Sequence, residues 1–143
     1  MHGAIRHFII GVFTATGLAA TFAAQAQSVA PMKQKVVSFS DKFMVQFEIR
    51  NTYATPQVNM ISIYTPDWKP VKASYVSKKA VKLASNDTLV ITAIVPFSEQ
   101  NDGSVNSRMV YVCNSIIPKV DGVGSAFKGE VCGKVFATKL QEQ

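Results

Sequence analysis

The clearest pattern of hydrophobic and polar positions lies in residues 42–51, which read KFMVQFEIRN. Every second side chain from Phe43 to Ile49 is apolar, and most of the positions between them are polar. A strand points successive side chains to opposite faces, so this segment would have one buried face and one solvated face. At helical spacing the same residues would be spread around the whole circumference. The pattern therefore predicts a half-buried β-strand that other strands assemble against.

Other extended runs follow along the chain, separated by polar or proline-containing turns. The segments expected to be strands are 35–39, 42–51, 57–64, 74–76, 80–83, 88–95, 107–117 and 130–138. No segment shows sustained apolar spacing of three and four residues, so helices are expected to be minor. About seven or eight short strands in a chain of this length predict an all-β fold, a two-sheet antiparallel β-sandwich. A small closed β-barrel is the alternative.

The N-terminal 26 residues are typical of a secretory signal peptide. Arg6 precedes an apolar run at 8–13, small and apolar residues follow, and the segment closes on the Ala-Gln-Ala of positions 24–26. We expect cleavage after Ala26 and a periplasmic or secreted bacterial product. A membrane anchor is the alternative, but the strongly apolar run is short against the ~20 residues that a spanning helix needs. No transmembrane span is therefore expected after cleavage.

The remaining chain has the length of one domain with one hydrophobic core. We expect residues 27–34 to form a flexible lead-in and residues 35–143 to form a single β-sandwich domain.

The histidines and cysteines narrow the chemistry. His2 and His7 both lie in the predicted signal peptide, so the mature protein would contain no histidine. This removes the usual general base and the commonest transition-metal ligand, and no catalytic residue, metal site or cofactor is predicted. Cys113 and Cys132 form an even pair for an oxidising compartment, and we interpret them as a structural disulfide.

The charge balance bears on the class of partner. The formal net charge is +6, and the lysines are spread along the chain. A basic balance favours anionic partners such as acidic polysaccharide, lipid headgroups or an acidic protein. Ordinary solvated surface is the alternative explanation. Nucleic acid is not expected, because the chain has neither an arginine-rich groove nor a known nucleic-acid motif.

Aromatic and basic residues gather between positions 64 and 82. Exposed Tyr and Trp side chains are favoured anchors at binding surfaces, and neighbouring lysines would add positive charge. Packing of the rings in the core or at its rim is the alternative. The candidate ligand-binding residues are Tyr64, Trp68, Lys69, Lys72, Tyr75, Lys78, Lys79 and Lys82.

Two parts of the sequence resemble known domains. The triplet YVC at 111–113 is similar to the tyrosine corner of immunoglobulin-like domains, where a Tyr precedes a Cys by two residues. The run from 47–51 through 58–63, the Pro-Asp-Trp corner at 66–68 and the turn at 84–87 resemble the first domain of periplasmic pilus chaperones. The resemblance implies an immunoglobulin-like antiparallel β-sandwich in the periplasm. Those chaperones have two domains, so their mechanism of anchoring a client in the inter-domain cleft is not implied for a single domain.

Three functional hypotheses follow. The first is an exported, non-enzymatic binding protein for an envelope protein or an anionic surface ligand. The second is a single-domain chaperone-like or structural assembly factor that uses strand addition. The third is a hydrolase that uses carboxylates alone, with candidates among the loop residues Asp87, Glu99, Asp102 and Asp121.

Overall fold

The computed structural model describes residues 28–99, 105–117, 119–120, 123–124 and 128–140, and their regular elements are β-strands. The predicted signal peptide and Asp102 and Asp121 lie outside these residues. The strands are β1 (Ser28–Ala30), β2 (Lys33–Ser38), β3 (Lys42–Arg50), β4 (Gln57–Tyr64), β5 (Tyr75–Val76), β6 (Ala80–Leu83), β7 (Thr88–Pro96), β8 (Ser107–Ile116), β9 (Lys119–Val120), β10 (Val123–Gly124) and β11 (Gly129–Lys139).

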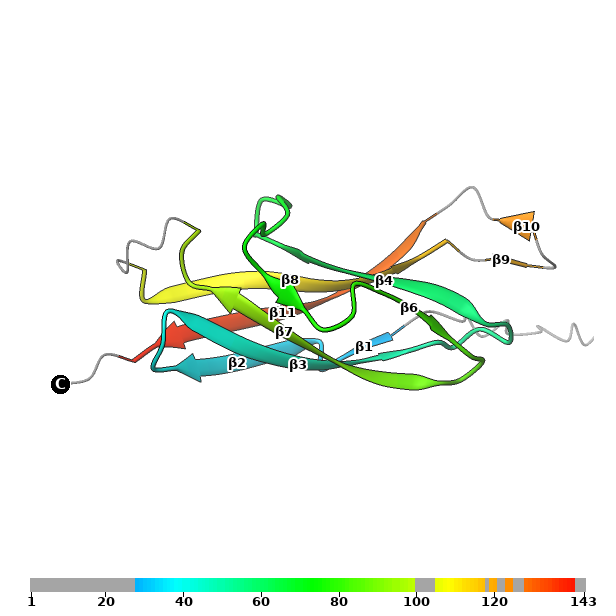
Figure 1. Ribbon diagram of the computed structural model, residues 1–143, viewed down its shortest axis with the longest axis horizontal. Coiled ribbons are helices and arrows are strands. Elements are labelled where there is room, and N and C mark those ends of the chain that lie inside the picture. Colours follow the sequence, from blue (N-terminus) through cyan, green and yellow to red (C-terminus); the bar gives the residue numbers. More distant parts are fainter. Residues whose placement is uncertain (1–27, 100–104, 118, 121–122, 125–127, 141–143) are drawn as a thin grey trace, which may run out of the picture.

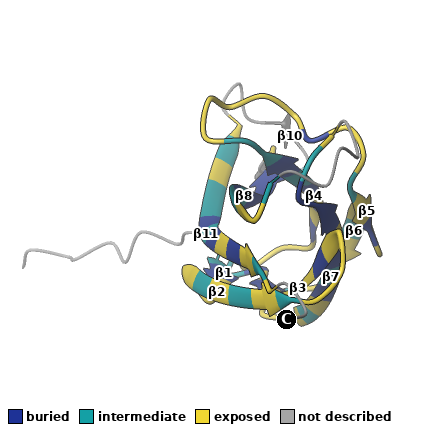
Figure 2. Cartoon of the chain, turned by 90° about the vertical axis from the view of Figure 1, so that its left-hand side faces the viewer, coloured by how far each residue is buried: buried dark blue, intermediate teal, exposed yellow. Residues whose placement is uncertain are grey.

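Two sheets pack face to face (Figures 1 and 2). A four-stranded sheet has the order β1-β3-β7-β5, and a five-stranded sheet has the order β2-β11-β8-β4-β6. The short strands β9 and β10 pair only with each other, within the connection from β8 to β11. The predicted β-sandwich is therefore confirmed, and the alternative of a closed barrel is wrong because the described strands form two open sheets.

The core forms as the alternation predicted. In β3 the side chains of Phe43, Val45, Phe47 and Ile49 are buried and those between them are exposed. β3 pairs with β7 along its whole length, and β7 contributes Ile91, Ala93 and Val95 to the same core. The facing sheet supplies inward residues such as Val110, Val112 and Val135. Because burial of apolar surface is the main favourable term in folding, these two inner faces hold the sandwich together.

The first described residues differ from the expected flexible lead-in at 27–34. β1 pairs antiparallel with β3, and the side chain of Val29 is 2% exposed in the core. The chain then crosses to the other sheet, where β2 pairs in parallel with β11 from Lys33 to Ser38. The segment is ordered because a buried valine and two sets of ladder hydrogen bonds hold it.

The disulfide lies between the two longest neighbouring strands of the five-stranded sheet. Cys113 of β8 and Cys132 of β11 stand directly opposite each other and are bonded. The two strands pair from Gly129 to Thr138, so the bridge links two consecutive late strands of that sheet.

A buried asparagine joins the loop after β3 to the end of β6 and the turn that follows it. The side-chain amide of Asn51, 1% exposed, donates to the carbonyl oxygens of Thr55, Leu83 and Ala84 at 3.0, 3.2 and 2.9 Å. Its side-chain oxygen accepts from the N–H of Tyr53 at 3.0 Å. Asn51 thus provides hydrogen-bond partners for backbone groups at the ends of β3 and β6.

Within the described ranges no helix has the length and hydrophobicity to cross a bilayer.

Candidate binding surface

The outer face of the five-stranded sheet carries a pair of stacked aromatic rings. Trp68, in the connection after β4, lies on Tyr111 of β8 with ring centroids 4.9 Å apart and planes inclined by 5°. The Trp68 ring also contacts Tyr64 of β4, with centroids 6.0 Å apart. Trp68 nevertheless remains 58% exposed. The predicted residues Tyr64 and Trp68 are therefore neighbours, and the stack leaves most of the indole accessible.

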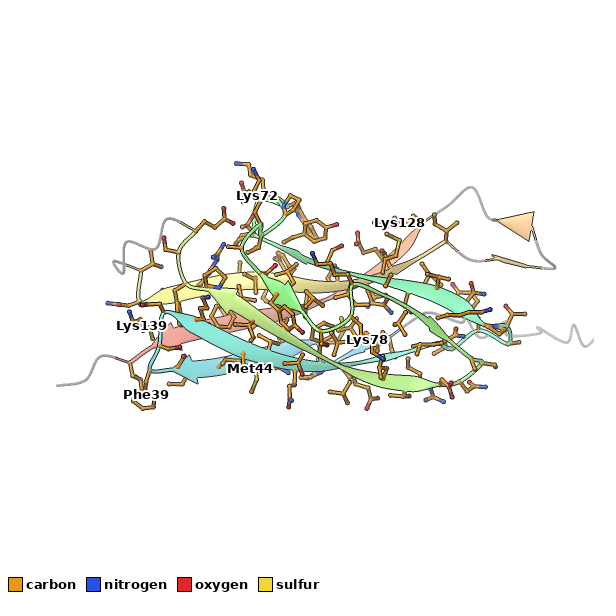
Figure 3. The ribbon with its side chains drawn as sticks, viewed as in Figure 1. Phe39, Met44, Lys72, Lys78, Lys128 and Lys139 are labelled. Atoms are coloured by element: carbon orange, nitrogen blue, oxygen red, sulfur yellow. A yellow bond between two sulfur atoms is a disulfide. The ribbon has the colours of Figure 1, made fainter. Side chains whose placement is uncertain are left out.

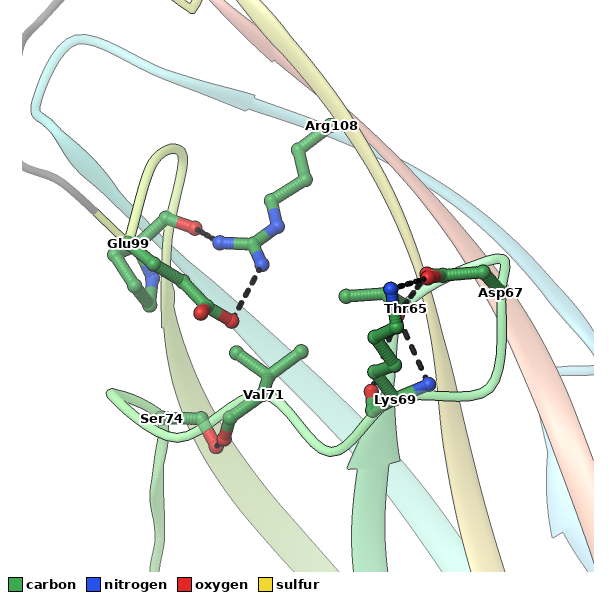
Figure 4. A network of polar contacts seen from close by, with 8 residues as sticks. Thr65, Asp67, Lys69, Val71, Ser74, Glu99 and Arg108 are labelled. Atoms are coloured by element: carbon green, nitrogen blue, oxygen red, sulfur yellow. Dashed lines mark hydrogen bonds and ion pairs between the residues drawn. The ribbon is translucent and has the colours of Figure 1, made fainter.

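Trp68 lies in a tight turn from Thr65 to Lys69, and Figure 4 labels Thr65, Asp67 and Lys69 of this turn. The N–H of Trp68 donates to the carbonyl of Thr65 at 2.9 Å, and the N–H of Thr65 donates to the carbonyl of Lys69 at 2.9 Å. The N–H of Lys69 donates in turn to the Thr65 hydroxyl oxygen at 3.1 Å. Trp68 has a φ of 61°, in the left-handed region that favours glycine or asparagine. A bulky residue is thus held in a backbone conformation that disfavours it.

The same turn contains an ion pair. The Lys69 ammonium lies 2.7 Å from an Asp67 carboxylate oxygen, and the Thr65 hydroxyl donates to the other oxygen at 2.5 Å. The hydrogen bonds from Lys69 and Thr65 lower the pKa of Asp67 from 3.8 to about 2. The same contact raises the pKa of Lys69. Lys69, a predicted site residue, therefore stabilises the turn and is not a free cation.

A lysine joins the aromatic residues of this face. The Nζ atom of Lys134 lies 5.5 Å from the ring centroid of Tyr111 and 5.6 Å from that of Phe136. Both distances are within the range of cation–π attraction. We call the five residues Tyr64, Trp68, Tyr111, Lys134 and Phe136 the outer-face platform.

Tyr64 also borders a cavity of about 220 Å³ between the edge of β4 and the segment that follows it. The predicted residues Lys72 and Lys79 line this cavity together with the apolar side chains of Ile63 and Val71. Three of the candidate residues therefore surround one small hollow that adjoins the platform.

The remaining candidates lie elsewhere. Tyr75 is in β5, at the edge of the other sheet, and is paired with Ile94. Lys78 is exposed in the connection from β5 to β6, well away from Lys72 in Figure 3. Lys82, in β6, is opposite Val58 and lines a second cavity, of about 290 Å³. The eight candidate ligand-binding residues therefore do not form one continuous surface.

Sequence reasoning missed Tyr111, Lys134 and Phe136 as site residues. Their partnership follows from the cysteine pair, because an antiparallel register is fixed once one pair of opposite residues is known. Tyr111 lies two residues before Cys113 and Lys134 lies two residues after Cys132, so the antiparallel register places them opposite each other. The disulfide prediction therefore contained the signal that would have located the platform.

The edge of β11 is incompletely paired. Its ladder with β2 runs only from Lys134 to Lys139, whereas its ladder with β8 begins at Gly129. Among the residues described, the outward edge from Gly129 to Cys132 has no strand beside it. The backbone N–H of Lys134 points toward this edge, away from β8, and donates to the carbonyl oxygen of Met32 at 2.8 Å. Since alternate residues point the same way, the backbone groups of Glu130 and Cys132 face this open edge.

The two described loop acids make structural contacts, Glu99 through its carboxylate and Asp87 through its backbone. The Arg108 guanidinium lies 3.3 Å from Glu99 and donates to the carbonyl of Pro96 at 2.6 Å (Figure 4). The backbone carbonyl of Asp87 accepts a hydrogen bond from the N–H of Asn51. The N–H of Asp87 donates to the carbonyl of Ala84 and closes the turn before β7. Glu99 is thus held in an ion pair, and Asp87 forms part of a turn through its backbone.

The sequence matches no protein-family model and no curated protein. The fold, however, is similar to that of solved structures. The periplasmic chaperone SfaE superposes with a TM-score of 0.62 at 10% identity, over 80% of this chain and 58% of the chaperone. The E. coli chaperone DraB gives a TM-score of 0.63 at 13% identity, over 80% and 55% of the two chains. This chain therefore spans little more than half the length of these chaperones.

A third similarity involves a domain of comparable size. The PapD-like domain of human CEP192 superposes with a TM-score of 0.60 at 9% identity and with complete coverage of both chains. Identities this low establish the fold alone. The chain has an immunoglobulin-like β-sandwich fold that resembles the periplasmic pilus chaperones.

Proposed function

We propose that the protein is an exported, non-enzymatic binding protein of the bacterial envelope that accepts a strand from a partner protein at the edge of β11. The observation that supports this proposal is that, in the part of the chain that the structure describes, no strand pairs with the outer backbone edge from Gly129 to Cys132. Unpaired N–H and C=O groups at a sheet edge are a template for another chain. A partner strand would form ladder hydrogen bonds there and place alternate side chains against the sheet.

Export and a periplasmic location belong to the same proposal. The signal-like composition of residues 1–26, the Cys113–Cys132 disulfide and the likeness to periplasmic chaperones support it. N-terminal sequencing of the protein from its host envelope fraction tests it, with Gln27 as the expected first residue. A mature product that begins at Met1 would contradict export.

A proline substitution tests strand addition directly. Proline has no N–H, and at position 130 it removes an outward-facing donor while leaving the ladder between β8 and β11 intact. The preceding residue is Gly129, which tolerates the restriction that proline imposes on its neighbour. Glu130→Ala is the matched control, because it loses the same side chain and its ion pair with Lys128 but keeps the N–H.

The assay is affinity capture from the host envelope fraction with tagged wild-type protein and both variants. We expect wild type and Glu130→Ala to retain one partner in high salt and Glu130→Pro to lose it, because ladder hydrogen bonds are screened little by ions. Retention by Glu130→Pro, or capture of no partner by wild type, would refute strand addition at this edge. Equal thermal stability of the two variants shows that the loss reflects the edge and not unfolding.

A further inference from the structure

The turn that carries Trp68 is unusual for a purely structural turn. At its φ of 61° a glycine or asparagine would be accommodated with less strain, yet the chain places its only tryptophan there. The indole is 58% exposed, so its burial does not explain the choice. One face of the indole stacks on Tyr111, and this fixes the ring against the sheet. A rigid, exposed aromatic ring in a strained backbone position is a feature expected of a binding site.

Lysine side chains border the platform on the side of β2. β2 lies beside β11, with Lys33 opposite Lys134 and Lys35 opposite Phe136. Residues that stand opposite each other on paired strands point to the same face of the sheet. Lys33 and Lys35 therefore project from the same face as the platform. Three lysines of two adjacent strands therefore border the aromatic rings.

Positive charge also lies on the other side, where Lys72 and Lys79 line the cavity next to Tyr64. The ion pairs found among the described residues include none of Lys33, Lys35, Lys134, Lys72 and Lys79. The nearby acids are already neutralised, since Asp67 pairs with Lys69 and Glu130 pairs with Lys128. Lys33, Lys35 and Lys134 on the outer face, together with Lys72 and Lys79 at the adjoining edge of the sandwich, therefore complement an anion.

The spacing of the lysines indicates an extended anion. The order β2-β11-β8-β4 places three strand spacings between Lys33 and Tyr64, or roughly 14 Å at ~4.8 Å per spacing, with the cavity lysines beyond. A single sugar or a simple ion does not reach both groups of lysines. A linear chain with a negative charge on successive units does.

We propose that the outer-face platform binds an acidic polysaccharide built from uronic-acid sugars. One sugar stacks the flat C–H face of its ring on the open side of Trp68, and carboxylates of neighbouring sugars pair with Lys134, Lys33 and Lys35. A sugar ring brings an apolar face and a carboxylate in one unit, which matches an exposed indole beside a lysine. The site lies on the face of the sheet and not on its edge, so it does not depend on strand addition to β11.

The probes are oligomers of galacturonate, mannuronate and glucuronate, each compared with its neutral methyl ester. The esters keep the sugar rings but lose the charges. Trp68 is the only tryptophan of the chain, so its fluorescence reports on the platform directly. We expect at least one acidic oligomer to change the emission saturably, with weaker binding in high salt and at least about tenfold weaker binding of its ester.

Three variants, compared by titration calorimetry, locate the site. Trp68→Gly removes the stacking ring and suits the turn, and Lys134→Met removes the charge but keeps an apolar stem of similar length. We expect each to weaken binding about tenfold or more. Lys42→Met makes the same charge change on β3, in the other sheet, and is expected to have no effect.

The remaining outcomes decide against the proposal. No binding of any acidic oligomer overturns it. Equal losses in Lys134→Met and Lys42→Met indicate diffuse attraction of a polyanion and also overturn it. Tighter, platform-dependent binding of polyglutamate or of phosphatidylglycerol vesicles assigns the surface to an acidic protein or a lipid instead. Glu130→Pro is expected to bind the oligomers normally, so failure of this proposal is distinguishable from failure of strand addition.

Discussion

The ring of Trp68 lies parallel to that of Tyr111, with centroids 4.9 Å apart, although Trp68 occupies a left-handed backbone position. Two opposing effects meet at this residue. The aromatic stack contributes about 0.5–1.5 kcal/mol, and the strained backbone costs about 1–3 kcal/mol. The strain is as large as the stacking contribution or larger, so the stacked ring of Trp68 adds little to the free energy of unfolding.

The first prediction concerns substitutions of Trp68. Trp68→Gly loses the stack but relieves the backbone, and we expect a change within about 1 kcal/mol in the free energy of unfolding. Trp68→Ala loses the stack and keeps the strain, so it is expected to be about 1 kcal/mol less stable than Trp68→Gly. Urea unfolding followed by circular dichroism measures both. Equal stability of the two variants would show that the backbone at position 68 is not strained.

The second prediction concerns the pH dependence of the turn at 65–69. The pKa of Asp67 is lowered to about 2, so the folded state binds this proton less tightly than the unfolded chain does. The contribution of the Asp67 contacts is therefore fully present above the ordinary pKa of 3.8 and is lost as pH falls through about 2.

Fluorescence of the adjacent Trp68 follows this transition during an acid titration. We expect a change centred near pH 2 in wild type and none at that pH in Asp67→Asn, which cannot titrate. A transition near 3.8 in wild type would mean that Lys69 and Thr65 do not hold the carboxylate.

The third prediction concerns Asn51. Its amide serves three buried or half-buried carbonyls, and Asn51→Ala leaves them without that donor. An unsatisfied buried polar group costs about 1–3 kcal/mol, so we expect a loss of at least about 2 kcal/mol in urea unfolding. Asn51→Asp keeps the shape but replaces the donor by a carboxylate that faces the same carbonyls. It is expected to be less stable than Asn51→Ala at pH 7 and to recover in part when acidified.

The fourth prediction concerns Gly133 of β11. A Cβ atom at this position would lie 2.9 Å from the carbonyl oxygen of Pro31 and 3.3 Å from Cγ1 of Val29. Because the nearer atom belongs to the backbone, Gly133→Ala has to displace the link between β1 and β2. We expect a loss of about 1–3 kcal/mol by chemical denaturation. Lys134→Ala, at the next residue with a half-exposed side chain, is the comparison and is expected to have a smaller effect. A neutral Gly133→Ala would mean that the link is loosely packed.

The sandwich was predictable because its central strands carry local patterns. The alternation in β3 and the β-branched run of β7 each specify a strand and its buried face. β1 was missed because a three-residue strand with one apolar side chain has almost no pattern. Val29 is buried because β3 and β11 approach it from distant parts of the chain. Such tertiary contacts are not readable from local sequence.

The candidate site was predicted in part for a similar reason. Tyr64 and Trp68 are close in sequence and were grouped correctly, but Tyr75 belongs to the other sheet despite its nearness in sequence. Lys134 and Phe136 lie far along the chain and reach the platform through the register between β8 and β11. A cluster in sequence becomes a cluster in space only when its residues share a sheet face.

The parallel pairing of β2 with β11 has a consequence for how the molecule is made. Lys33 is among the earliest residues of the domain and Lys134 among the last, yet they are neighbours. A ribosome or an export channel releases a chain from its N-terminus onward. β2 therefore cannot form its ladder with β11 until nearly the whole domain has emerged. The five-stranded sheet is completed only when β11 is in place, and a polypeptide truncated before β11 lacks the strand with which β2 pairs.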